Sequence, residues 1–236
     1  MMRLIIVSIF WASICSSQGL PELTEVTNHF LEEHVESGMV DYKAIHQNPS
    51  RIQQLYEQIG STSLENASDA EKKAFYINAY NILTIYQIVQ NYPVKSPTDV
   101  EGFFDNMKHQ VAGESLTLDQ VEKERLMKNH FDPRLHFVLV CAAKSCPPLA
   151  SFAFQADQLD EQLDERTREA LNNPDFIRVN KNQKKVEVSQ IFEWYKQDFT
   201  KESSSILAYI NQYRDEEIPS SYQVSFYKYD WALNAQ

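Results

Sequence analysis

The chain has 236 residues, 43% of them hydrophobic and 12% aromatic, and a net charge of −11 at neutral pH. This length and composition suit a single globular domain with a sizeable core. The negative charge argues against nucleic-acid binding, which needs a basic surface. The sequence contains neither G-x-G-x-x-G nor G-x-x-x-x-G-K-[ST], so the usual phosphate-binding loops are excluded.

The first residues predict export. Arg3 precedes the apolar run Leu4–Cys15, and two serines follow it. A basic end, about a dozen apolar residues and small residues behind them are typical of a secretory signal peptide, and the run is too short to span a membrane. We therefore expect residues 1–18 to be a signal peptide and residues 19–236 to form one domain, secreted or periplasmic, with no membrane span after cleavage.

The longest predicted helix covers residues 68–91. Ser68 and Glu71 form a capping-box pattern at its start. The helix is apolar on more than one face, which favours a buried, central position. Asn78 and Asn81 lie on the same side of it. We expect their amides either to bond neighbouring loop backbone or to form the floor of a binding pocket.

Periodicity predicts the other elements. Together they indicate an α+β fold, mostly helical with a small central sheet. The expected helices are residues 23–35, 49–60, 117–128, 157–171, 189–199 and 203–213, and the expected strands are residues 108–118 (a hairpin), 176–180, 185–188 and 222–229.

The stretch Asp132–Leu149 (DPRLHFVLVCAAKSCPPL) holds the most distinctive chemistry. Its near-continuous apolar run predicts a strand at residues 135–143, interior to the sheet. Because side chains alternate along a strand, His136 and Cys141 are expected to point to opposite faces. Cys146 follows on a turn that ends in Pro-Pro. We expect a cleft there, at the carboxyl end of the strand.

Three interpretations of the two cysteines remain open. In an oxidising compartment Cys141 and Cys146 can pair as a disulfide, or both can be inert thiols. Alternatively, Cys146 is a nucleophile, since the nearby Lys144 favours its thiolate. A nucleophilic thiol needs a base, and His136 and His109 are the candidates. Backbone N–H groups near Cys146, or an Asn, would then hold the oxyanion.

Other catalytic and metal-binding patterns are missing. The sequence has no H-E-x-x-H, C-x-x-C, EF-hand or G-x-S-x-G pattern, so we predict no metal ligands and no cofactor. Aromatic residues near the C-terminal half are the natural lining for a cleft. With Asn78 and Asn81, the predicted binding residues are Trp194, Tyr195, Asp230 and Trp231.

Six motifs, in order, resemble the domain-of-unknown-function family 547. They are VDY (40–42), KAFYINAYNILTI (73–85), VAGESLTLDQVE (111–122), the stretch 132–149, VSQIFEWYKQDF (188–199) and YDWALN (229–234). The resemblance covers about residues 38–234 and implies exported or multidomain proteins without a settled activity. Two departures stand out: Tyr76 replaces the family's usual Trp, and Glu122-Lys123 replaces Glu-His, so any role of that His is absent here.

The sequence leaves three functional hypotheses. The first is a domain that binds a small molecule or peptide in the cleft. The second is a cysteine-dependent hydrolase or acyltransferase with Cys146 as nucleophile; its Ser-Cys-Pro-Pro motif is similar, by analogy only, to papain-like and transglutaminase-like enzymes. The third is a non-catalytic structural or interaction protein. The sequence does not predict an oligomeric state.

Overall fold

A computed structural model describes residues 19–236, and the predicted signal peptide, residues 1–18, lies outside the described residues. The fold is α+β, as predicted. Its elements are α1 (Leu20–His34), β1 (Val35–Glu36), β2 (Met39–Val40), α2 (Tyr42–Gln47), α3 (Ser50–Ser61), α4 (Asp69–Gln90), a 3₁₀ helix (Pro97–Asp99), β3 (His109–Val111), β4 (Glu114–Leu116), α5 (Leu118–Gln120), a π-helix (Val121–Met127), a 3₁₀ helix (Pro133–Phe137), α6 (Leu159–Asn172), β5 (Ile177–Asn180), β6 (Lys185–Ser189), α7 (Ile191–Trp194), α8 (Lys196–Thr200), α9 (Ile206–Asn211) and β7 (Gln223–Tyr227).

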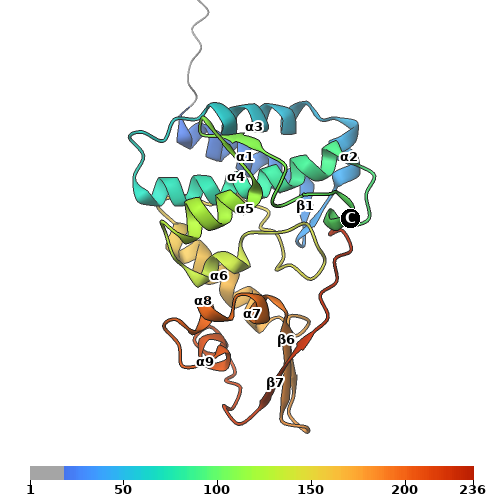
Figure 1. Cartoon of the computed structure of the whole chain (residues 1–236), viewed down its shortest axis with the longest axis vertical. Coiled ribbons are helices and arrows are strands. Elements are labelled where there is room, and N and C mark those ends of the chain that lie inside the picture. The colour runs from blue at the N-terminus through green and yellow to red at the C-terminus, as the bar shows by residue number, and fades with distance from the viewer. Residues whose placement is uncertain (1–18) are drawn as a thin grey trace, which may run out of the picture.

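The buried helix α4 organises the N-terminal half (Figure 1). It packs against α1, α2, α3 and the π-helix. The predicted capping box is present: the Ser68 hydroxyl accepts from the Glu71 N–H, and the Glu71 carboxylate accepts from the Ser68 N–H. Residues on every face of α4 are buried, which confirms that the helix is central.

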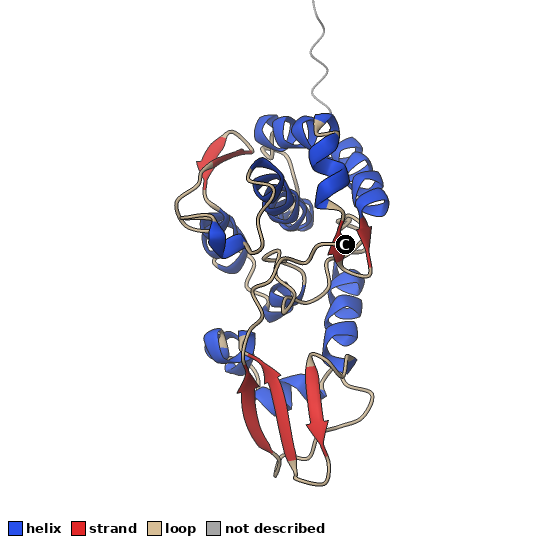
Figure 2. Ribbon diagram, turned by 90° about the vertical axis from the view of Figure 1, so that its right-hand side faces the viewer, coloured by secondary structure: helices blue, strands red, loops and turns tan. Residues whose placement is uncertain are grey.

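The three-stranded sheet lies at one end of the molecule, away from α1–α4 (Figure 2). Strand β6 pairs antiparallel with β5 and parallel with β7. The predicted hairpin at β3 and β4 is confirmed, as are the strands β5, β6 and β7. The predicted small sheet is present, and it lies at one end of the molecule rather than at its centre.

The predicted strand at residues 135–143 does not form. Pro133–Phe137 is a 3₁₀ helix, and irregular chain follows it. The side chain of Asn81 takes the place of a neighbouring strand: its Nδ2 donates to the Val138 carbonyl at 2.9 Å, and its Oδ1 accepts from the Val140 N–H at 3.0 Å. With these backbone groups satisfied, the apolar run is buried against α4 without a sheet.

The C-terminal tail returns from the sheet to the helical half, where the C-terminus lies close to β1 (Figure 1). The Lys144 N–H donates to the Ala232 carbonyl at 2.8 Å, and the Asn234 N–H donates to the Ala142 carbonyl at 3.0 Å. The side chain of Asn234 accepts from the buried hydroxyl of Tyr42 at 2.8 Å. The tail thus covers the loop that the sequence predicted to be a strand.

Gly38 allows the β1–β2 turn to approach the Pro-Pro segment closely. Its φ of +80° favours glycine, and a Cβ at this position would lie 2.6 Å from Cβ of Pro148. Separately, none of the helices within residues 19–236 combines the length and the apolar character that crossing a membrane requires.

Candidate functional site

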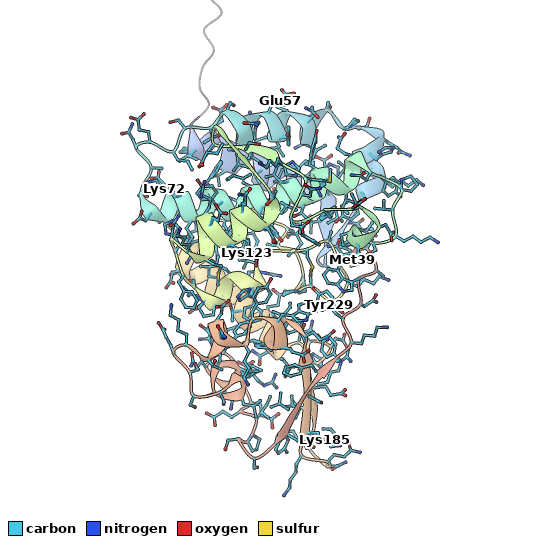
Figure 3. All side chains as sticks on the ribbon, viewed as in Figure 1. Met39, Glu57, Lys72, Lys123, Lys185 and Tyr229 are labelled. Atoms are coloured by element: carbon cyan, nitrogen blue, oxygen red, sulfur yellow. A yellow bond between two sulfur atoms is a disulfide. The ribbon has the colours of Figure 1, made fainter. Side chains whose placement is uncertain are left out.

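A cavity of about 260 Å³ lies between the helical half and the sheet-bearing half. Tyr229, which contributes to its wall, is labelled in this region in Figure 3. Residues from α4, α5, the π-helix, the loop 138–147, α7 and the C-terminal tail meet there. The lining consists of Tyr80, Phe104, Asp119, Glu122, His136, Leu139, Cys141, Cys146, Pro147, Ile191, Trp194, Tyr195, Tyr229 and Trp231.

The imidazole of His136 is buried and held from two sides. Its Nε2 lies 2.8 Å from Oδ2 of Asp198. Its ring lies 4.1 Å, centroid to centroid, from the ring of Tyr195 and 5.2 Å from that of Phe199. Because the carboxylate accepts from Nε2–H, it fixes the orientation of the imidazole.

Glu122 contributes a buried carboxyl group to the cavity wall. It is only 8% exposed, and it lies on the π-helix, a kind of local widening that is frequent at functional sites. Burial raises its pKa above the ordinary value, against the opposing effect of nearby His136. Burial and the neighbouring Glu122 together raise the pKa of Tyr195. Glu122, His136 and Tyr195 therefore form one electrostatically coupled group.

Cys141 and Cys146 are joined by a disulfide in the cavity wall. The Tyr229 hydroxyl lies 3.1 Å from each sulfur atom. The expectation that His136 and Cys141 point to opposite faces of a strand is wrong, because no strand forms there. Both cysteines and His136 line the same cavity.

Aromatic rings surround the opening of the cavity. Trp194 is 47% exposed, and its ring lies 4.9 Å from that of Tyr229 and 6.0 Å from that of Trp231. The ring of Phe104 also lies near Trp231, with 6.3 Å between the ring centroids. These contacts hold an exposed indole in place, so the opening presents a preformed aromatic surface.

Five of the predicted site residues come together here: Cys146, His136, Trp194, Tyr195 and Trp231. The other four do not line the cavity, although all were proposed for it.

His109 is buried elsewhere and contacts Gln87. Asn78 exchanges hydrogen bonds with the backbone of Phe154, and Asn81 exchanges them with the backbone of Val138 and Val140. Of the two interpretations of these amides, the first is therefore confirmed: both bond loop backbone. Asp230 is exposed, and its Oδ1 accepts from the Ala232 N–H within the tail.

Among the wall residues that sequence reasoning missed are Asp119, Glu122 and Tyr229. Asp119 and Glu122 lie one helical turn apart, close to position 123, where Lys replaces the family's usual His. That replacement was the signal in the sequence that could have drawn attention to these two residues. Tyr229 begins the last motif of the resemblance. None of the three carries a spacing that indicates a site by itself.

The arrangement offers two kinds of chemistry. The aromatic surface and the buried carboxyl group can bind a small ligand. If the disulfide were reduced, Cys146 would share a cavity with a histidine that a carboxylate orients, which are the elements of cysteine-dependent acyl transfer. Within residues 19–236, no cluster of His, Cys, Asp and Glu side chains has an arrangement that could hold a metal ion.

Residues 64–171 match the family described as "Protein of unknown function, DUF547". This match supports a domain of this family within the chain, as the motifs indicated. No curated protein and no solved structure matches the chain.

The matched segment includes the cavity residues from Tyr80 to Pro147. The remaining wall, from Ile191 to Trp231, comes from the chain that follows the match.

Proposed function

We propose that this chain is an exported domain that binds a small molecule, or one side chain of a peptide, in the cavity beside the Cys141–Cys146 disulfide. The observation that carries the proposal is the preformed cavity, whose walls come from segments far apart in the chain. Its volume of about 260 Å³ is just below the roughly 300–1,000 Å³ of typical ligand pockets. A compact ligand fits this volume better than an extended one. Export rests on the predicted signal peptide.

The test is a ligand-observed NMR screen of small compounds and short peptides against the wild-type chain and two variants. Trp194→Ala removes the most exposed wall of the opening. Phe226→Ala is the matched control, because Phe226 is the other exposed large hydrophobic residue within residues 19–236 and does not line the cavity. We expect compounds whose affinity falls about tenfold, roughly 1.4 kcal/mol, in Trp194→Ala and is unchanged in Phe226→Ala.

A screen without such compounds, or with compounds that bind both variants as they bind the wild type, would contradict the proposal. The third hypothesis, a structural or interaction protein, would then account better for the chain.

A second candidate function is cysteine-dependent acyl transfer by the reduced chain. One observation favours it: Cys146 and His136 line the same cavity, and Asp198 orients His136. After reduction of the disulfide, the Cys146 thiolate would attack a carbonyl carbon. Protonated His136 would give its proton to the departing amine or alcohol, and water or another nucleophile would then release the acyl group.

Peptide mass spectrometry under non-reducing conditions first establishes how much of the chain carries the disulfide. The reduced chain is then alkylated with iodoacetamide over a range of pH. We expect Cys146 to react with an apparent pKa well below the ordinary value of about 8.5, and His136→Gln to move it back toward that value. Cys141 serves as the internal control. Equal reactivity of the two thiols at the ordinary pKa would exclude a nucleophilic Cys146.

A further inference from the structure

The cavity wall carries more negative than positive charge. Asp119 and Glu122 line it, and Asp198 is hydrogen-bonded to His136 just behind it. No lysine or arginine belongs to the described lining. Lys123 pairs with Asp119 and points its largely exposed side chain toward solvent.

Glu122 makes no ion pair within residues 19–236 and is 92% buried, since its exposure is 8%. Its charged neighbours are Asp119, Lys123 and His136, and the hydroxyl of Tyr195 lies close to it. Carboxylates at such burial are normally paired with a cation, because an unpaired buried charge is costly. The space on the open side of Glu122 is the cavity.

Six of the fourteen residues in the wall are aromatic: Tyr80, Phe104, Trp194, Tyr195, Tyr229 and Trp231. The rings of Trp194, Tyr229 and Trp231 contact one another, with centroid separations of 4.8 to 6.0 Å. Aromatic faces attract organic cations through their quadrupoles, most strongly when the cation is desolvated. Walls of this kind form the cages that recognise alkylated ammonium groups.

We propose that the cavity binds an alkylated ammonium group, with Glu122 as its counter-charge and the Trp194–Tyr229–Trp231 cluster as its aromatic cage. This assignment rests on the proposed function and names its ligand class. A trimethylammonium head fits both features: it is weakly hydrated, it packs on ring faces, and its charge meets a carboxylate that makes no ion pair within residues 19–236. The same chemistry is present in a small free cation and in a methylated lysine side chain.

The competing interpretation is that Glu122 is protonated and only bonds Tyr195. A neutral wall would then bind a neutral ligand as well as a cation of the same shape. Choline and dimethylbutanol, in which carbon replaces the ammonium nitrogen, differ in this respect alone. Dimethylbutanoate supplies the opposite charge on a similar skeleton.

Tryptophan fluorescence of the full chain reports binding directly. Of its three tryptophans, Trp194 and Trp231 line the cavity, and Trp11 is common to every variant. We expect choline to change the fluorescence saturably, with an affinity at least about tenfold higher than that of dimethylbutanol and no measurable binding of dimethylbutanoate. Glu122→Gln should abolish this preference. Glu124→Gln, an exposed carboxyl two residues along the same helix, should retain it.

Equal binding of choline and dimethylbutanol, with both weakened by Trp194→Ala, would overturn the cation assignment and leave the binding pocket in place. Preference for choline that persists in Glu122→Gln would overturn the role of Glu122. Binding of neither compound would also overturn the assignment, whereas the broader screen alone decides the proposed function. If Glu122→Gln unfolds, the three compounds on the wild-type chain still decide between the interpretations. Comparing the affinity for choline with the affinity for a peptide that contains trimethyllysine then distinguishes the two sources of the ammonium group, a small free cation and a methylated lysine side chain.

Discussion

His109 shows what burial does to a single ionisable residue. It is 4% exposed, and its Nε2 lies 2.6 Å from Oε1 of Gln87, whose Nε2 donates to the Phe103 carbonyl. Because Oε1 of Gln87 can only accept, Nε2 of His109 carries a proton and the neutral ring satisfies this contact. Burial lowers the pKa of His109 from 6.5 to about 4. This residue is a structural histidine, and its ionisation affects stability.

We predict that His109 makes the chain less stable in acid. Above pH 6.5 neither the folded nor the unfolded state protonates this ring. As the pH falls from 6.5 to about 4, the unfolded chain takes up a proton that the folded chain excludes, so stability is lost; below about 4 both states are protonated and the loss stops. The loss amounts to roughly 3 kcal/mol. Urea unfolding at a series of pH values measures it.

The variant His109→Gln should flatten the pH profile over this window, because no proton can bind at that position. His29→Gln is the matched control, since His29 is exposed. Parallel profiles for the wild type and His109→Gln would show that His109 does not contribute.

The residue type of Asn78 and Asn81 was enough to predict how their side chains are used. Mid-helix asparagines need partners, and the expectation that Asn78 and Asn81 bond loop backbone is confirmed. The same bonds explain why the strand prediction failed. An apolar run is equally compatible with a strand and with a buried loop, and the amide of Asn81, 59 residues away from Val140, decides between them.

Helices that begin with a capping pattern and continue with a clear apolar periodicity could be predicted from the sequence. For α4, Ser68 and Glu71 mark the start, and the apolar residues set the length. The sequence predicts one helix at residues 189–199, but α7 and α8 are two short helices that meet at Tyr195. The break places Tyr195 against His136, a contact that depends on residues 59 positions apart. Periodicity contains no information about such a break.

We predict that Ser68→Ala destabilises the chain by about 1 kcal/mol, because it removes the hydroxyl that caps the Glu71 N–H at the start of α4. Urea unfolding provides the measurement. Ser63→Ala is the control, since Ser63 lies in the preceding linker and caps no helix. Equal free energies of unfolding for the two variants would mean that the Ser68 hydroxyl adds no stability to α4, because the burial of this helix is sufficient.

The site itself belongs to the whole molecule. Its wall joins Tyr80 in α4 to Trp231 in the tail, and no local pattern connects them. Aromatic composition could predict Trp194, Tyr195 and Trp231 as candidates. It could not predict Glu122, because its burial results from packing of the π-helix against α4.

The tail is attached to the helical half through a buried pair, in which the Tyr42 hydroxyl donates to Oδ1 of Asn234. Asn234 also donates to the Gly38 carbonyl at 3.2 Å. We predict that Asn234→Ala costs about 2–4 kcal/mol, because it leaves both groups unpaired. Tyr42→Phe should cost less, and a double-mutant cycle should give a coupling energy of about 1–2 kcal/mol.

The half-buried pair Tyr86 and Gln53 is the matched control for this cycle, with an expected coupling below about 0.5 kcal/mol. Similar coupling energies for the two pairs would mean that the tail contributes no more than a surface contact. Urea unfolding of each single and double variant supplies the four free energies of a cycle.

The anchoring of the tail also determines the order in which the molecule can be completed. Synthesis runs from the N-terminus, so the Tyr42 hydroxyl emerges almost two hundred residues before its partner Asn234. During that interval α1–α4 can pack, but the aromatic cage has only one of its indoles until Trp231 arrives. If the cavity binds a ligand as proposed, the complete binding wall is therefore the last feature that a newly made chain acquires, and the ligand could not assist any earlier step of its folding.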